Sequence, residues 1–120
     1  MITDRMKERY VRRILNGPTV LRLYTHIGDA ERSIVEARGG GYSSHVIQAS
    51  DWSVTGGLAQ GQIHEFRFDG TARLKIAGAY LTDDVGYPLW IYPFADVLPV
   101  GRAGDIIPVR ASFSMGVMTT

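Results

Sequence analysis

Apolar and polar residues alternate along most of the chain after its first 17 residues, with the two-residue period of half-buried β-strands. In the segment 107–115, Ile107, Val109 and Ala111 occupy one set of alternate positions, while Arg110 lies on the other. Similar segments cover 20–26, 42–49, 62–68, 74–80 and 89–94. The pattern predicts a mainly β fold, an antiparallel β-sandwich of about seven strands.

The first 17 residues follow a helical period and predict one N-terminal α-helix over about 3–15. Its apolar stripe comprises Ile2, Met6, Tyr10 and Ile14, widened by Val11 and Leu15. The opposite arc comprises Arg5, Arg9, Arg12 and Arg13. These arginines either form the solvated face of a helix packed on its own sheet, or dock the helix onto an acidic neighbour. We therefore expect an amphipathic docking or packing element at 1–17 and a β-sandwich domain at 18–120.

Turn residues predict how the strands are joined. Asp69-Gly70 is typical of a hairpin turn, and Asp83-Asp84 before Gly86 is typical of a turn closed by local side-chain hydrogen bonds. The segment 27–38 is predicted to be a long polar loop, and the three glycines 39–41 are predicted to form a flexible segment that leads into the next strand. These signals favour many sharp connections within one domain.

Composition narrows the classes of function. The chain has 120 residues, enough for one hydrophobic core, and no cysteine, which excludes disulfides and thiolate metal sites. The net charge of +1 argues against a general nucleic-acid binder, so we expect no sequence-specific nucleic-acid partner. Without an apolar run of roughly 18–20 residues, we expect a soluble chain that has no membrane partner.

Residues that could support catalysis or metal binding are few. The histidines His26, His45 and His64 are widely spaced, with no His-x-x-x-His pair, so we expect them at the surface or on edge strands. The glycines 39–41 lack a P-loop lysine, and the serines lack a Gly-x-Ser-x-Gly elbow. We therefore predict no enzyme activity, no catalytic residue, no cofactor and no metal ligand.

Aromatic residues are concentrated around 87–94, where Tyr87, Trp90, Tyr92 and Phe94 occur with Pro88 and Pro93. Because proline cannot donate to a strand ladder, this strand is predicted to be an edge strand or locally bent. The aromatic side chains suit a protein interface or, together with Trp52, a platform on which sugars stack. The alternative is that Trp52 and Trp90 fill the interior of the sandwich.

Several short segments occur in a characteristic order between residues 18 and 117. They are LRLYTH at 21–26, GYSS at 41–44, Trp52, FRF at 66–68, GAYLTD at 78–83 with LW at 89–90, and GDIIPV at 104–109 before SFS at 112–114. This order resembles that of small virion structural proteins of tailed bacteriophages. The resemblance implies a non-enzymatic component, assembled in the host cytoplasm and found in the virion, with no catalytic residues.

The leading hypothesis is a capsid decoration or cement protein that binds the major capsid protein and forms homo-oligomers. A minor tail protein or baseplate adaptor that binds tail proteins is an alternative, and so is a carbohydrate-binding module; a small hydrolase has little support. The candidate interface residues are Arg5, Arg9, Arg12, Arg13, Tyr87, Trp90, Tyr92 and Phe94. The sequence leaves open the location in capsid or tail, the copy number, and whether the helix packs on its own sheet.

Overall fold

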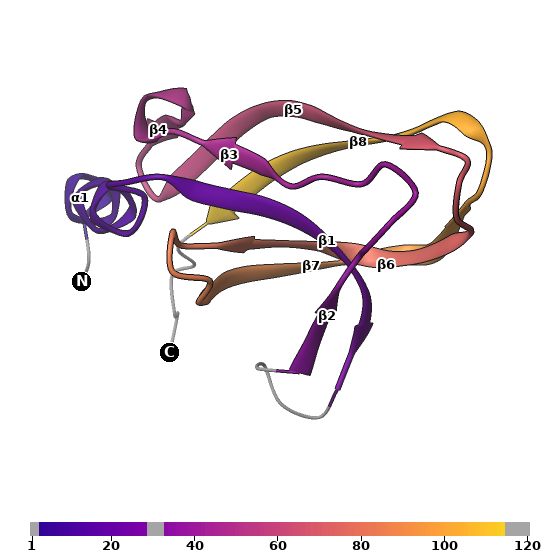
Figure 1. Cartoon of the computed structure of the whole chain (residues 1–120). Coiled ribbons are helices and arrows are strands. Elements are labelled where there is room, and N and C mark those ends of the chain that lie inside the picture. The colour runs from indigo at the N-terminus through magenta and orange to yellow at the C-terminus, as the bar shows by residue number, and fades with distance from the viewer. Residues whose placement is uncertain (1–2, 29–32, 115–120) are drawn as a thin grey trace.

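The computed structural model describes residues 3–28 and 33–114, and it places one helix at one end of two antiparallel sheets (Figure 1). The helix is α1 (Asp4–Ile14). The strands are β1 (Thr19–Ile27), β2 (Ile34–Glu36), β3 (His45–Ile47), β4 (Ser53–Thr55), β5 (Leu58–Asp69), β6 (Leu74–Thr82), β7 (Pro88–Val100) and β8 (Ala103–Ser114). The predicted β-sandwich with an N-terminal helix is confirmed.

The two sheets differ in size. In the first, β2 and β3 pair with successive parts of β1, and β6 and β7 follow on its other side. The second has the order β4-β5-β8. The core between them includes Leu21, Leu23, Phe66, Ile76 and Leu81. Each sheet therefore turns one face toward the core, and the apolar residues at alternate positions of its strands lie on that face.

The helix α1 begins where Thr3 caps it, because the Thr3 hydroxyl accepts a hydrogen bond from the Met6 N–H at 3.2 Å. It packs against β4 and β5 through Val11 and Leu15, which belong to the common core. The helix thus packs on its own sandwich. Among the described residues, no helix is long and apolar enough to cross a membrane.

The strands β5 to β8 form one antiparallel ribbon that bends from the second sheet into the first. Asp69 pairs with Ala103 at the end of the β5–β8 part, and Leu74 pairs with Val100 at the start of the β6–β7 part. The predicted hairpin turn at Asp69-Gly70 is therefore wrong, since β5 and β6 lie in different sheets. Gly70 instead makes a corner: its φ is +81°, and a Cβ there would lie 2.6 Å from the Ala103 nitrogen.

The connections between β1 and β4 also differ from the sequence prediction. The expected loop at 27–38 contains β2, which pairs with the end of β1. The strand expected at 42–49 is shorter, because only His45–Ile47 pairs with β1. The preceding glycines 39–41 all have positive φ and turn the chain, while the Gly40 carbonyl accepts from the Asp69 N–H at 2.9 Å.

Candidate functional site

The outward face of α1 combines apolar and basic side chains. Met6, Tyr10 and Ile14 are 43%, 44% and 40% exposed, whereas Val11 and Leu15 are buried. The apolar stripe seen in the sequence is therefore divided: Val11 and Leu15 face the core, whereas Met6, Tyr10 and Ile14 are partly exposed, and Ile2 lies outside the described residues. Figure 1 shows α1 at one end of the sandwich. The exposures of its apolar residues show that only part of its apolar surface is covered by the strands.

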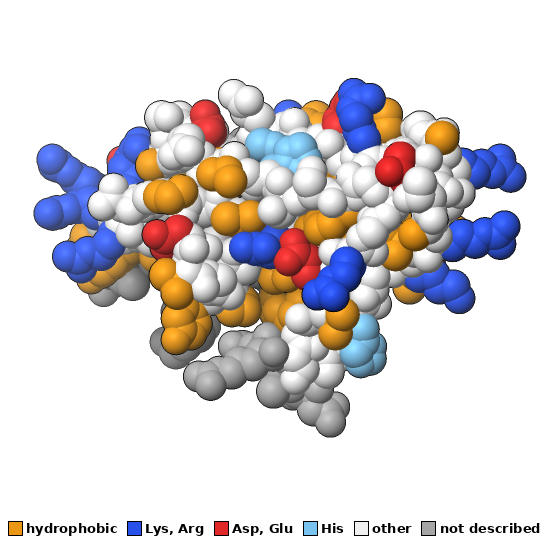
Figure 2. Space-filling model, in the orientation of Figure 1, with side chains coloured by type: hydrophobic (Ala, Val, Ile, Leu, Met, Phe, Trp, Pro, Cys, Tyr) orange, Lys and Arg blue, Asp and Glu red, His pale blue; other side chains and the backbone are white. Residues whose placement is uncertain are grey.

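The arginines of α1 lie beside this exposed stripe. Arg5, Arg9, Arg12 and Arg13 are all exposed. Figure 2 shows several blue side chains projecting from the α1 end of the molecule. Met6, Arg9, Tyr10 and Arg13 line a shallow hollow of about 280 Å³. We call Met6, Tyr10, Ile14 and the four arginines the helix surface; it presents apolar contact area and positive charge together.

The second candidate surface is the edge strand β7. It pairs with β6 on one side and ends the order of the first sheet among the described strands, as its prolines predict. Its register with β6 is irregular between the Ile76–Leu98 and Gly78–Pro93 pairs, where β7 has extra residues. The bend predicted as an alternative to an edge position is therefore also present.

The aromatic residues of this region form a row. The rings of Trp90 and Tyr92 are 5.0 Å apart at 31°, and those of Tyr92 and Phe94 are 6.4 Å apart at 73°. Tyr92 is 50% exposed and Tyr87 is 62% exposed, whereas Trp90 and Phe94 pack partly against the core. Trp52 is buried in the core, so it does not join this row. The arrangement offers a partly exposed aromatic row on β7, whose second edge pairs with none of the described strands.

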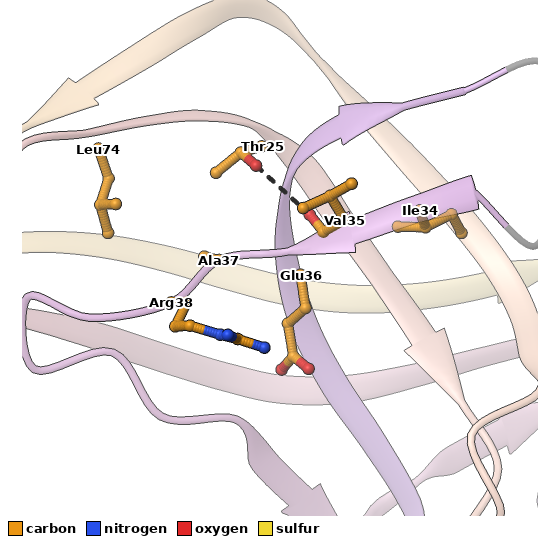
Figure 3. Close-up of a pocket in the computed structure, with 7 residues that line it drawn as sticks. All are labelled: Thr25, Ile34, Val35, Glu36, Ala37, Arg38 and Leu74. Atoms are coloured by element: carbon orange, nitrogen blue, oxygen red, sulfur yellow. Dashed lines mark hydrogen bonds between the residues drawn. The ribbon is translucent and has the colours of Figure 1, made fainter.

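A groove beside β2 is lined by Thr25, Ile34, Val35, Glu36, Ala37, Arg38 and Leu74 (Figure 3). Its volume is about 640 Å³. Figure 3 shows Glu36 and Arg38 directed to the same side of this segment. The Glu36 carboxylate is already used by the fold, because Arg22 Nη1 donates to its Oε1 at 3.0 Å and the Tyr42 hydroxyl donates to its Oε2 at 2.7 Å. The groove is therefore mainly an aliphatic surface feature.

Tyr42 fills a gap in the hydrogen-bond ladder of β1. Between the parts of β1 that pair with β3 and β2, the Leu23 N–H donates to the Tyr42 hydroxyl at 3.1 Å. Burial raises the pKa of the Tyr42 phenol well above its usual value, and the neighbouring Glu36 carboxylate raises it further. Tyr42 thus stays protonated and joins β1 to Glu36.

A groove with basic walls lies at the corner where the ribbon bends. Arg73, Lys75 and Arg102 line it together with Asp105, and its volume is about 670 Å³. The Asp105 carboxylate accepts from the N–H groups of Gly101 and Arg102, each at 3.0 Å, which lowers its pKa. This carboxylate closes the β7–β8 turn, so the groove presents chiefly positive charge.

The fold brings together two of the three histidines. The Nδ1 atoms of His45 and His64 are 3.4 Å apart, although the residues are 19 positions apart in the chain. His26 is exposed on β1. Residue spacing could not reveal this pair, but one signal was present: His64 alternates in phase with the buried Phe66, and His45 with the buried Ile47. Both histidine side chains thus lie on the inward faces of their strands, where they are only partly buried.

The turn role predicted for Asp83-Asp84 is confirmed. The Asp83 Oδ1 accepts from the N–H groups of Val85, Gly86 and Tyr87 at 3.0, 2.8 and 2.8 Å.

In the described part of the chain, no group of three or more His, Cys, Asp or Glu residues is placed to hold a metal ion. The candidate binding surfaces are the helix surface, the β7 edge and the two grooves.

Comparison of the chain with family models, with curated proteins and with solved structures found no match.

Proposed function

We propose that this chain is a non-enzymatic structural protein of a tailed-phage virion, a capsid decoration or cement protein that binds neighbouring virion proteins. It would be assembled in the host cytoplasm and retained in the particle. The phage assignment rests on the sequence resemblance. The binding role is supported by the exposed apolar and basic side chains of the helix surface and by the β7 edge, which are suited to protein contacts.

The observation that carries this proposal is the composition of the helix surface. Three apolar side chains stay 40–44% exposed next to four arginines, although α1 is already fixed to the sandwich by Val11 and Leu15. Burying these side chains against a partner would remove apolar area from water, and arginine and tyrosine are enriched where interfaces gain most energy. An acidic partner surface, such as one on the major capsid protein, would complement the charge.

The β7 edge provides a second contact in this proposal. An unpaired edge strand exposes backbone N–H and C=O groups that another strand or segment can pair with. The aromatic row of Trp90, Tyr92 and Phe94 adds contact area beside this edge. We propose that copies of the chain associate symmetrically through this region while the helix surface binds the shell.

Particle incorporation tests the role of the helix surface. Arg9→Glu, and the triple reversal of Arg5, Arg9 and Arg12, should reduce the amount of protein that co-purifies with particles. Arg110→Glu is the matched control, because Arg110 is exposed on β8, whereas α1 packs chiefly against β4 and β5. Unchanged circular dichroism would show that each variant folds. Full incorporation of the triple variant would refute docking through α1.

Copy number separates the two virion locations. Quantitative mass spectrometry of purified particles should find hundreds of copies for a decoration protein. A handful of copies would instead favour the tail or baseplate adaptor. Absence of the protein from particles made by the phage that encodes it would refute the virion assignment altogether.

A carbohydrate-binding module is the second candidate, and the aromatic row is the observation that favours it. Sugar faces stack on flat rings, and Tyr92 presents half of its surface to solvent beside Trp90. Binding on a glycan array that is lost in Trp90→Ala and Tyr92→Ala would support this candidate. Tyr87→Ala is the control, because Tyr87 is exposed near the row but is not in ring contact with it among the described pairs.

A further inference from the structure

The groove at the corner of the ribbon combines positive charge with an apolar lining. Its exposed basic side chains are Arg73, Lys75 and Arg102. Its apolar lining comprises Leu74, Pro99 and Val100. Figure 2 shows blue side chains projecting at the end of the molecule opposite α1. None of the three basic side chains forms an ion pair with a described residue. The groove therefore suits a ligand that offers both a carboxylate and an aliphatic group.

The other groups in this groove narrow the class of ligand. The Asp105 carboxylate also lines it, but Asp105 is bound by the N–H groups of Gly101 and Arg102 and offsets only part of the charge of the three basic side chains. None of the described residues that line the groove is aromatic, so nucleic-acid bases have no ring to stack on there. The lining therefore favours an acidic protein segment over a nucleic acid.

The turn between β6 and β7 has the complementary chemistry. Asp84 is exposed and forms no ion pair with a described residue, and the side chain of Val85 is 77% exposed. Asp83 adds a second carboxylate, whose Oδ1 accepts from three backbone N–H groups of the turn at 2.8–3.0 Å. These hydrogen bonds fix the shape of the turn, so its binding to a partner would cost little conformational entropy. We call residues 83–85 the acidic tip.

A chain cannot place its own acidic tip in its own groove. Leu74, which lines the groove, is the first residue of β6, and Thr82, which precedes the tip, is the last. At about 3.3 Å per residue, these two ends of the strand lie about 26 Å apart. Figure 1 shows the corner and the β6–β7 turn at opposite ends of the molecule. Contact between the two surfaces therefore requires a second copy.

We propose that the acidic tip of one copy docks into the corner groove of a second copy, so that chains associate head to tail. The arginines of the groove would bind the tip carboxylates, and Val85 would cover Leu74 and Pro99. Because the two surfaces differ, the contact is heterologous and can be repeated from copy to copy. It uses neither the helix surface nor the aromatic row, so it can be tested independently of the virion role.

Sedimentation velocity of the full chain over a concentration series tests this contact. The average mass of the wild type should rise with concentration at about 0.05 M NaCl and rise less at about 1 M NaCl, where exposed charges are screened. The tip variant Asp84→Asn/Val85→Ser and the groove variant Arg73→Gln/Arg102→Gln should each need at least about fivefold higher concentration to associate.

Glu65→Gln and Arg110→Gln are the matched controls, because both side chains are exposed on the second sheet and each change removes one charge. Both controls should associate like the wild type. A wild type that stays monomeric at low salt would overturn the proposal. So would unchanged association of the tip and groove variants, or equal weakening in the controls.

Mixing the two variants tests the direction of the contact. The tip variant keeps an intact groove, and the groove variant keeps an intact tip. At a concentration where the wild type associates, the mixture should form dimers that contain one chain of each variant and should form nothing larger. A mixture that stays monomeric although both variants give a wild-type circular dichroism spectrum would refute head-to-tail docking.

Carbodiimide cross-linking of the wild type provides a measurement without substitutions. The reagent joins a carboxylate to an amine as an amide and takes up the water that is lost. Lys7 and Lys75 are the lysines of the chain. In a mixture of isotope-labelled and unlabelled chains, mass spectrometry should find Lys75 of one copy linked to Asp83 or Asp84 of the other. Links between copies that involve Lys7 alone would contradict the proposed contact.

Discussion

The hydroxyl of Tyr42 is expected to contribute a large share of the stability of the first sheet. Tyr42→Phe keeps the ring, which stacks on Phe66 with centroids 5.9 Å apart, but removes two hydrogen bonds. One is the bond from the Leu23 N–H at 3.1 Å, and the other is the bond to Glu36 at 2.7 Å. The change therefore tests polar bonding with little change in packing.

The magnitude follows from the groups left without partners. An unsatisfied buried N–H costs about 1–3 kcal/mol, and a hydrogen bond to a charged group contributes about 1.5–3 kcal/mol. Glu36 is partly exposed and keeps its bond to Arg22, so water and Arg22 recover much of the second contribution. We therefore expect a loss of about 2–3 kcal/mol in the free energy of unfolding.

Urea denaturation followed by tryptophan fluorescence measures this loss. The midpoint should fall while the slope m stays unchanged, because the surface exposed on unfolding is nearly the same. Tyr87→Phe is the matched control, since the Tyr87 side chain is 62% exposed. If Tyr42→Phe and Tyr87→Phe unfold within about 0.5 kcal/mol of each other, the role given to the Tyr42 hydroxyl is incorrect.

Three further predictions concern stability. Gly78→Ala should destabilise the fold by about 2–4 kcal/mol in urea, because its Cβ would lie 2.5 Å from the Tyr92 carbonyl oxygen and against the Tyr24 ring; a wild-type midpoint would show that the sheet yields easily. The lowered pKa of His64 means that the folded chain binds this proton more weakly than the unfolded chain, so stability should fall as pH drops below about 6.5. His64→Gln should flatten that part of the pH profile of the urea midpoint, and an unchanged slope would exclude His64 as its source. Val11→Ala should cost about 1–3 kcal/mol and Ile14→Ala less than about 0.5 kcal/mol, because only Val11 is buried; similar losses for both would contradict the orientation of α1.

Local signals in the sequence predicted much of the architecture. The alternation at Ile107, Val109 and Ala111 was enough to assign their buried face, and Thr3 marked the start of the helix. The prolines of β7 correctly indicated an edge. These signals worked because side-chain alternation, helix capping and the missing N–H of proline depend on neighbouring residues along the chain.

Signals of the same kind failed where the outcome depended on remote segments. Asp69-Gly70 has the chemistry of a tight turn, but the local residues do not show that β5 pairs with β8. Met6, Tyr10 and Ile14 fit an apolar stripe, but the stripe is wider than the surface that the sandwich offers to α1. In both places, the partner of the segment is distant in sequence.

The sequence by itself determined the kinds of elements, the face that each strand buries and the chemistry of the turns. The tertiary structure decided which strands pair, which part of α1 stays exposed, and that His45 meets His64 at 3.4 Å while Tyr42 reaches the backbone of Leu23. The physical reason is that periodicity and turn preference are local properties. Pairing across layers is set by the mutual fit of many segments and by the chain entropy lost when distant segments are joined.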